Sequence, residues 1–282
     1  MAIMGRNRPA VWLTVSALTS GICLAPLPAS GQAAVDPTTL TGLRLAQHHF
    51  YSGRYEAAAE AVASLTASEA SALAAFELRT SALHFQIKRL IGDAPNKSKA
   101  FKQCADCAGL LAAFMKDVTA GKALAKARLK SEPQNESALF YLGKLDLNYV
   151  WLQLSTLGQR TGWGEYWNAR RSMDAVLKAN PKSVRARVAR AWIDYIVDTR
   201  VPFGVQWMLG GGDKKRALRT VTEAAAADGD LFDRAEAGFA HWEMLVREKR
   251  LKEAADVAKR LLAEFPENQE LQRFVSKAGG LS

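Results

Sequence analysis

The chain has 282 residues and a formal net charge of +10. This length allows a sizeable core, arranged as one extended domain or two small ones. No segment after residue 33 contains the roughly 20 consecutive apolar residues that a membrane-spanning helix takes. A transmembrane span in the mature chain is therefore excluded, and a soluble product is expected.

The first 33 residues are predicted to form an export signal. Arg6 and Arg8 give a charged start, the apolar run Val11–Ala25 follows, and prolines and small residues lead to an expected cleavage site near Ala33. Cleavage would remove the charges of Arg6 and Arg8 with no acidic residue, which changes the formal charge from +10 to +8. The alternative is an uncleaved N-terminal anchor.

The mature chain is expected to be exported, and to be periplasmic if the source is bacterial. Cys23 lacks the aliphatic and small residues of a bacterial lipoprotein box, so it is expected to be lost with the signal. An exported basic protein is poorly placed to meet nucleic acid. The charge therefore indicates solubility or attraction to acidic surfaces.

A short frame of glycine, tyrosine and alanine recurs along the chain. Gly-x-Tyr-x-x-Ala occurs at Gly53–Ala58 and again at Gly164–Ala169, and Leu251–Ala254 repeats its end with leucine in place of tyrosine. A proline follows the small residue by twelve positions at Pro181 and Pro266. A glycine at the turn, a wedge between helices and a small contact residue are what a repeated helix pair needs.

The frame is similar to the tetratricopeptide repeat (TPR) superfamily, whose second helix carries a small alanine and ends at a proline. Gly121 with Pro133 fits these two positions, and Ala217 with Gly229 keeps the spacing without the proline. The small residues at 58, 121, 169, 217 and 254 lie further apart than the usual period of about 34 residues. The repeats are therefore expected to carry long helices or insertions.

The helix boundaries support an all-α chain independently of the resemblance. Pro133, Pro181 and Pro266 are each followed two positions later by a residue that caps a new helix, namely Asn135, Ser183 or Asn268. Apolar residues then recur every three or four positions, and no alternating β-branched run occurs. Residues 34–282 are predicted to form a right-handed TPR-like α-solenoid of four to five antiparallel helix pairs.

Two regions depart from the regular pattern. Residues 67–101 read as one long helix with a loop at 92–98, and residues 198–212 insert a proline, aromatic residues and three glycines between helices. Repeat arrays commonly place insertions on a binding face. The alternative for 198–212 is a spacer that caps the groove.

Cys104 and Cys107 form the cysteine pair of the mature chain. They are expected about one turn apart on a helix face, as a structural disulfide or two buried thiols. Redox activity is a further alternative, although the βαβ unit that carries such a motif in thioredoxin-like proteins is absent. Ala108 stands where haem attachment requires histidine, and no second cysteine pair supplies zinc ligands.

The remaining chemistry-bearing residues indicate binding rather than catalysis. The four histidines are interpreted as structural, and no metal or cofactor is expected. Basic residues after Gly210–Gly212 suggest an anion cradle at a helix start, with Asp213 as a plain N-cap being the alternative. A second basic group lies on neighbouring helices, where it either lines the concave surface or is solvated: Arg170, Arg171, Arg185, Arg187 and Arg190.

The leading hypothesis is a non-catalytic scaffold that binds a protein or peptide partner, acidic partners included, in the concave groove. The alternative is a small-molecule binding accessory protein that resembles TPR proteins associated with TRAP transporters, and a thiol oxidoreductase using the cysteine pair is a distant third. Nucleic acid is not expected as a partner. The predicted groove residues are Tyr141, Asn148, Trp167, Arg171, Arg187 and Trp207.

Overall fold

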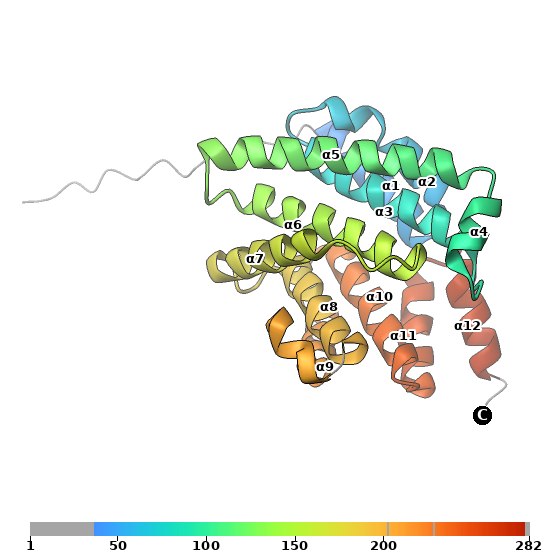
Figure 1. Ribbon diagram of the computed structural model, residues 1–282. Helices are drawn as coiled ribbons and strands as arrows, with labels where there is room; N and C mark the ends of the chain where they lie inside the picture. The colour runs from blue at the N-terminus through green and yellow to red at the C-terminus, as the bar shows by residue number, and fades with distance from the viewer. Residues whose placement is uncertain (1–36, 202, 228, 280–282) are drawn as a thin grey trace, which may run out of the picture. The chain divides into compact units, whose positions relative to one another are not determined.

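The computed structural model describes residues 37–201, 203–227 and 229–279, so the predicted export signal at 1–33 lies outside the described residues. Within these ranges the chain is helical and has no strand. The first helices of successive pairs are α1 (Pro37–Tyr51), α3 (Ala72–Ile91), α6 (Glu136–Trp151), α8 (Val184–Arg200) and α10 (Leu231–Arg247). The second helices are α2 (Tyr55–Ala61), α5 (Cys107–Ser131), α7 (Trp163–Ala179), α9 (Lys214–Ala225) and α11 (Leu251–Glu264), and α12 (Gln269–Gly279) follows the last pair (Figure 1).

The recurring small residues lie where the repeat pattern predicts them. Each one is buried in the second helix of a pair, in the described part of the chain: Ala58, Gly121, Ala169, Ala217 and Ala254. A Cβ atom at Gly121 would lie 2.7 Å from Leu145 Cδ1 and 3.0 Å from Phe76 Cβ, so a larger residue would require these side chains to shift. This close packing of small residues confirms the all-α helical-repeat fold.

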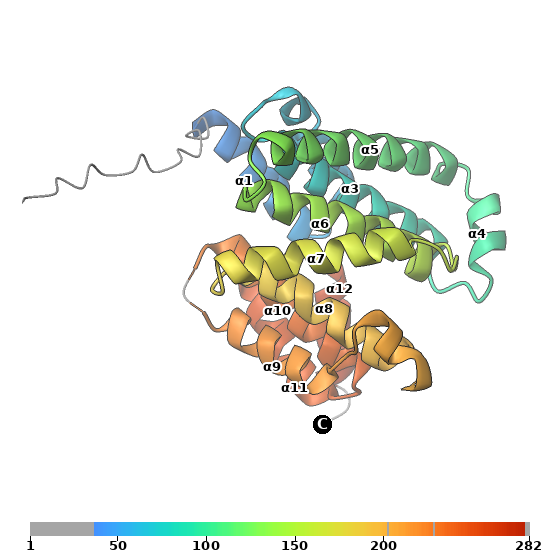
Figure 2. The ribbon, with the colours of Figure 1, turned by 60° about the vertical axis from the view of Figure 1, so that its left-hand side comes forward.

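Neighbouring pairs share apolar cores, as expected for a repeat array. Phe140, Met173 and Ile193 pack together among α6, α7 and α8, which succeed one another in Figure 2. Val221 and Met244 belong to the next core, among α8, α9 and α10. The stack is therefore continuous, and each pair buries its apolar side chains against the pair that follows.

Two of the predicted caps following prolines make the expected hydrogen bonds. The side chain of Asn135 accepts from the amide of Ala138 at 2.8 Å, and that of Asn268 accepts from Leu271 at 3.0 Å. Ser183 starts α8 without a side-chain hydrogen bond to the helix. Polar side chains thus fix the starts of α6 and α12.

The region 67–101 contains the predicted long helix, α3, which ends directly before the loop predicted from Gly92. A 3-10 turn, η1 (Ser64–Ala67), precedes α3, and a separate short helix, α4 (Lys97–Gln103), follows the loop. Gly92 has a φ of +60°, which ends α3, and the Asn96 side chain accepts from the amide of Lys99 at 2.9 Å to start α4.

The cysteine pair lies differently from the prediction. Cys104 follows the last residue of α4 and Cys107 is the first residue of α5, so the pair spans the turn between two helices rather than one helix face. The two residues are joined by a disulfide bond, with Cα atoms 5.4 Å apart. This bond fixes the turn that leads into α5.

The predicted insertion between α8 and α9 contains a 3-10 segment, η3 (Phe203–Leu209). The hydroxyl of Tyr166 donates to the Leu209 carbonyl at 2.8 Å, and Arg170 donates to the Gly210 carbonyl at 2.8 Å. A Cβ atom at Gly212 would lie 2.4 Å from the Asp198 nitrogen, so glycine allows the chain to return closely past α8. The insertion is therefore tied to α7 and α8.

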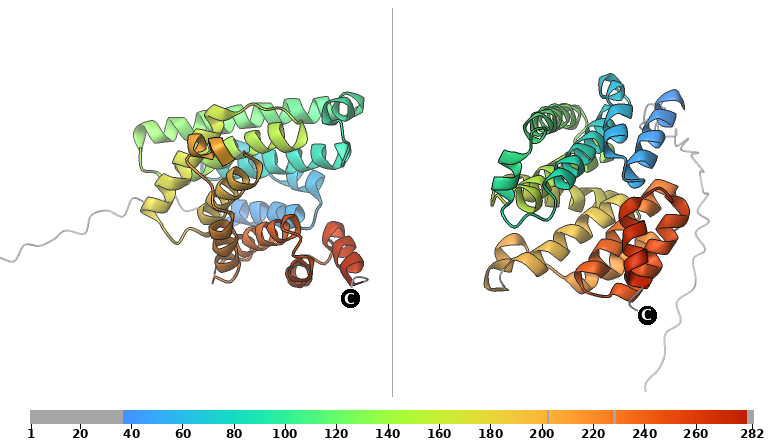
Figure 3. Two further views of the ribbon diagram at one scale, coloured as in Figure 1. Left: turned by 60° about the horizontal axis from the view of Figure 1, so that its bottom comes forward. Right: turned by 90° about the vertical axis from the view of Figure 1, so that its right-hand side faces the viewer.

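The first and last helix pairs of the array are in contact with each other. The ring of Tyr51 at the end of α1 lies 5.4 Å from that of Phe239 and 5.5 Å from that of Phe265, between ring centroids. The amide nitrogen of Asn268 donates to the Tyr51 carbonyl at 2.8 Å. The helical unit therefore curls until the end of α1 meets α10 and the turn between α11 and α12. Figure 3 shows the unit from two further sides.

Candidate functional site

Inside this curl lies a groove of about 1980 Å³, here called the inner groove. Its wall comes chiefly from the first helices of the pairs and from α12, with contributions from α2, the start of α7, η2 (Leu152–Thr156) and η3. Among the described residues, α5, α9 and α11 contribute nothing to the lining. The second helices α5, α9 and α11 thus form the outer layer.

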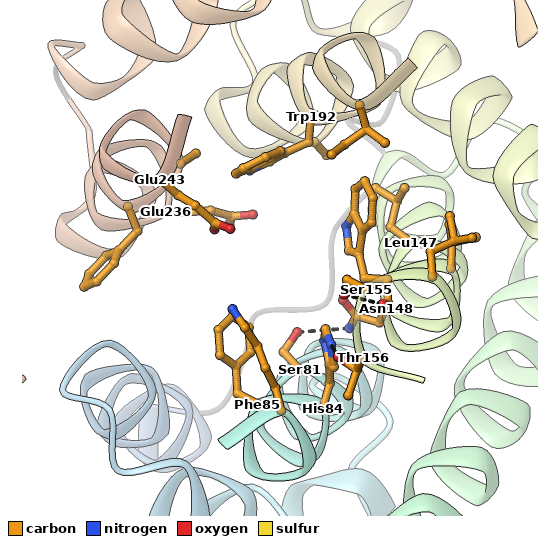
Figure 4. Close-up of a pocket in the computed structure, with 18 of the residues that line it drawn as sticks. Ser81, His84, Phe85, Leu147, Asn148, Ser155, Thr156, Trp192, Glu236 and Glu243 are labelled. Atoms are coloured by element: carbon orange, nitrogen blue, oxygen red, sulfur yellow. Dashed lines mark hydrogen bonds between the residues drawn. The ribbon is translucent and has the colours of Figure 1, made fainter. Parts of the chain in front are cut away.

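Aromatic side chains cover much of the inner groove. Trp151 of α6 and Trp192 of α8 lie with ring centroids 6.4 Å apart, and Phe85 and Phe239 come from α3 and α10. Trp163, at the start of α7, is 55% exposed and also lines the groove. Figure 4 shows Trp192 and Phe85 reaching into one cavity from different helices. Such rings offer large apolar faces to a bound molecule.

Four ionised side chains form an inner charge cluster: Glu77, Lys144, Arg185 and Glu236. Arg185 binds Glu77 at 3.1 Å and Glu236 at 2.6 Å, while Lys144 binds Glu236 at 2.5 Å. Burial acts to raise the pKa of Glu236, but Lys144 and Arg185 together lower that pKa to about 2. Each member belongs to a different first helix, so the cluster connects α3, α6, α8 and α10.

A neutral polar cluster lies next to it, formed by Ser81, His84, Asn148 and Thr156. The Asn148 side-chain nitrogen donates to Ser81 Oγ at 3.0 Å, and His84 Nε2 lies 2.8 Å from Thr156 Oγ1. Burial, reinforced by Lys88, lowers the pKa of His84 to about 3. The π-helical turn η2 places Thr156 opposite His84. Turns of this kind occur frequently at functional sites.

Three of the six predicted partner-binding residues line the inner groove. Tyr141 lies with its ring 5.8 Å from the Arg185 guanidinium, Asn148 belongs to the neutral polar cluster, and Trp167 contributes to the wall near the start of α7. These three side chains lie in one connected space.

The other three predicted residues are outside the inner groove. Arg171 donates to the Asn168 side chain at 2.7 Å, and Arg187 pairs with Glu223 at 2.8 Å. Trp207 is 75% exposed on η3 but does not line the groove. Arg187 is two positions from Arg185, which on a helix places the two side chains on nearly opposite sides.

The two predicted basic groups are largely engaged within the protein. Arg190 and Arg216 both bind Asp194, at 2.5 and 2.9 Å, and Lys214 binds Glu248 at 2.8 Å. Asp213 accepts from the amide of Arg216 at 2.8 Å. Asp213 is therefore the N-cap of α9, as the alternative interpretation of this turn expects. Arg185 alone of the Arg170–Arg190 group lines the inner groove.

Several groove residues were missed by sequence reasoning, although a spacing signal exists. Four of the first helices present groove-lining side chains seven residues apart, which is about two helical turns. The seven-residue pairs are Glu77 with His84, Lys144 with Trp151, Arg185 with Trp192, and Glu236 with Glu243. A search for seven-residue spacing in the helix preceding each small residue would have found them.

The described part of the chain holds no group of three or more histidine, cysteine, aspartate or glutamate side chains that could bind a metal ion. Nor does any helix in that part have the length and apolar character needed to cross a membrane.

No protein-family model matches the chain, and no curated protein matches it significantly. Among solved structures, the chain is similar to a thermophilic TPR protein from Thermus thermophilus. That similarity has 16% sequence identity and a TM-score of 0.49, and it covers 85% of this chain and 98% of the other. The helix pairs and their buried small residues decide the fold. The chain is an all-α helical-repeat protein.

Proposed function

We propose that the protein is an exported, non-catalytic scaffold that binds a segment of a partner protein in the inner groove. The observation that carries the proposal is the convergence of the first helices on one aromatic-lined space. In this proposal the export signal at residues 1–33 directs the chain out of the cytoplasm, to the periplasm if the source is bacterial.

The size of the groove supports a polypeptide ligand. Pockets for small molecules usually measure about 300–1,000 Å³, whereas the inner groove measures about 1980 Å³. A helical or extended segment lying along α3, α6 and α8 would make use of this volume. Its apolar side chains would pack on rings such as Trp151 and Trp192, which are partly exposed to the groove.

The charge of the lining favours an acidic segment. Eleven lining residues are lysine or arginine and seven are aspartate or glutamate. The acidic members Glu77 and Glu236 are already paired inside the inner charge cluster. Basic residues nearer the rim, such as Arg160 and Arg200, are exposed and available to an acidic partner.

A non-catalytic role is consistent with the state of the ionisable groups in the groove. A general base works best with a pKa near the operating pH, but burial holds the pKa of His84 at about 3 and ion pairing holds that of Glu236 at about 2. Both groups are thereby stabilised in one protonation state at neutral pH.

A second candidate is the binding of a small molecule. The contact of α1 with α10 and the turn between α11 and α12 favours it, because closing an array end to end restricts entry to the space inside. A transporter-associated binding protein would use such an enclosed cavity. The size of the groove makes this the second candidate.

Site-specific photo-crosslinking in living cells tests the proposal. A photoreactive amino acid would replace Trp192 or Phe239 in the inner groove, and Lys126 or Lys259 on the outer helices α5 and α11 as controls. We expect covalent adducts with a polypeptide at the two inner positions only. Adducts restricted to the outer positions, or inner adducts with a small molecule, would contradict the scaffold proposal.

A further inference from the structure

The neutral polar cluster has two side-chain atoms whose hydrogen-bonding capacity is unused. His84 and Asn148 are each only 6% exposed, and Thr156 is 2% exposed, yet all three line the inner groove. Figure 4 shows them together at one side of the cavity. Neither atom is sealed off from the groove and neither is paired within the described part of the chain, so both are available to a ligand.

The first unused atom is Nδ1 of His84. The hydroxyl of Thr156 has one hydrogen-bond partner among the described residues, His84 Nε2 at 2.8 Å. We assign Nε2 as the acceptor because the Thr156 hydroxyl donates to no other described group, and this assignment places the proton of the neutral ring on Nδ1. Burial keeps the pKa of His84 near 3 and the ring therefore neutral. Nδ1 makes no hydrogen bond to any described residue and is left as a donor.

The second unused atom is Oδ1 of Asn148. Its side-chain nitrogen donates to Thr80 Oγ1 at 2.9 Å and to Ser81 Oγ at 3.0 Å, which fixes the orientation of the amide. Oδ1 accepts no hydrogen bond within the described part of the chain. Because Ser81 and His84 are one helical turn apart on α3, this acceptor and the His84 donor belong to the same small area of wall.

We propose that the neutral polar cluster is an anchor subsite for an uncharged carboxamide of the bound segment, whose N–H donates to Asn148 Oδ1 and whose carbonyl accepts from His84 Nδ1. This inference rests on the proposed function, because a polypeptide supplies such groups in its main chain and in its asparagine and glutamine side chains. The rings of Phe85 and Trp151, which neighbour the cluster residues in sequence, also line the groove.

A charged group fits this subsite poorly. Lys88 lies 5.1 Å over the Phe85 ring, and Glu243 is paired with Arg247 at 2.5 Å. The charge of Lys88, which helps to lower the pKa of His84, disfavours an ammonium in the cluster. A carboxylate entering the cluster would lose its hydration and find few donors in exchange. An amide loses less and finds both of its hydrogen bonds.

NMR of the folded protein with ring-labelled histidine provides the test. The probes are N-acetylphenylalaninamide and its acid, N-acetylphenylalanine, which share the ring and differ in the terminal group. We expect the amide to shift the His84 Nδ1 resonance and to bind at least about tenfold more tightly than the acid, a difference of about 1.4 kcal/mol. Propionamide and N-methylacetamide then separate a side-chain carboxamide from a main-chain amide.

The variant Thr156→Val removes the hydroxyl that fixes the ring tautomer and keeps the side-chain shape. We expect it to weaken amide binding about three- to tenfold, as for the loss of a neutral hydrogen bond. Thr119→Val on α5 is the matched control, because the Thr119 hydroxyl is exposed and donates to the Met115 carbonyl on the outer layer. The control is expected to bind the amide as the natural chain does.

Equal binding of amide and acid, an unshifted His84 resonance or an absence of amide binding would each overturn the subsite. Equal effects of Thr156→Val and Thr119→Val on amide binding would also overturn the subsite. The crosslinking experiment distinguishes failure of the amide subsite from failure of the proposed function. If inner positions still crosslink to a polypeptide, only the amide subsite fails, and if they do not, the proposed function fails with it.

Discussion

Glu77 on α3 and Arg185 on α8 form an ion pair of 3.1 Å across the inner groove, although 108 positions separate them in the sequence. Lys144 and Glu236 complete the inner charge cluster from α6 and α10. In a simple repeat array each unit contacts only its neighbours. Here the first helices of four successive pairs each contribute one residue to the inner charge cluster. The cluster therefore connects repeats that are not neighbours in the stack.

The variant Glu236→Gln tests this coupling. It leaves Lys144 and Arg185 with Glu77 as their remaining partner, and removing one member of a buried pair leaves charge poorly solvated. We expect the free energy of unfolding to fall by about 2–4 kcal/mol in urea denaturation. Glu267→Gln is the control, since its pair with Arg54 is exposed on both sides, and should change stability by less than about 0.5 kcal/mol. Equal losses would contradict the coupling.

The acid sensitivity of the fold should follow the same cluster. The pKa of Glu236 is lowered from 4.5 to about 2 in the folded chain, so its stabilising effect is complete above pH 4.5 and is lost as the pH falls toward 2. We expect the thermal midpoint of the natural chain to fall steeply in this window. In Glu236→Gln the slope between these pH values should be shallower, and an unchanged slope would count against the assignment.

His84 should act in a higher pH window. Its pKa is lowered from 6.5 to about 3, so between these pH values His84 binds a proton in the unfolded chain but not in the folded chain. The stability due to neutral His84 is complete above pH 6.5 and falls as the pH drops toward 3. We expect His84→Gln to flatten the fall in thermal midpoint between about pH 6.5 and pH 5, where Glu236 is still ionised. A slope equal to that of the natural chain would be the opposite result.

Packing at the outer layer gives a matched pair of glycine variants on α5. Gly121→Ala places a Cβ atom 2.7 Å from Leu145 Cδ1, and this overpacking should cost about 1–3 kcal/mol of unfolding free energy. Gly109→Ala on the same helix meets nothing within 4 Å, and should gain about 0.5–1 kcal/mol from improved helix propensity. Chemical denaturation of both variants checks the pair, and a neutral Gly121→Ala would refute the predicted contact.

The disulfide is expected to serve the fold rather than redox chemistry. Cys107 is fully buried, and the bond closes a loop between residues only three positions apart. Replacing both cysteines with serine should lower the unfolding free energy by about 1–2 kcal/mol, because closing so short a loop restricts the unfolded chain little. Insulin-reduction assays should detect no activity in the natural protein. Activity that disappears in Cys104→Ser would support the oxidoreductase alternative.

The sequence revealed the repeats because their signals are local. A small residue, a proline and a capping side chain, as at Ala254, Pro266 and Asn268, lie close together in the sequence and mark the boundary between successive helices. The loop predicted from Gly92 rested on a local signal of the same kind, because the positive φ of this glycine ends α3.

The site was harder to predict because it depends on distant contacts. Tyr51 meets Phe265 only after five helix pairs, among the described residues, have each added a small rotation. Arg185 lines the inner groove and Arg187 lies outside it, although the two are only two positions apart. An error in the predicted rotation of the helix about its axis therefore assigns the wrong arginine to the groove. Composition alone carries no information on that rotation.

Native mass spectrometry of the protein, isolated without denaturation, tests most directly whether the inner groove holds a polypeptide. The natural chain and Trp192→Ala would be compared, with Trp207→Ala as the control outside the groove. We expect an extra mass that denaturation releases and proteases digest, present in the natural chain and the control and lost in Trp192→Ala. An extra mass that is not polypeptide, or that Trp192→Ala retains, would contradict the account.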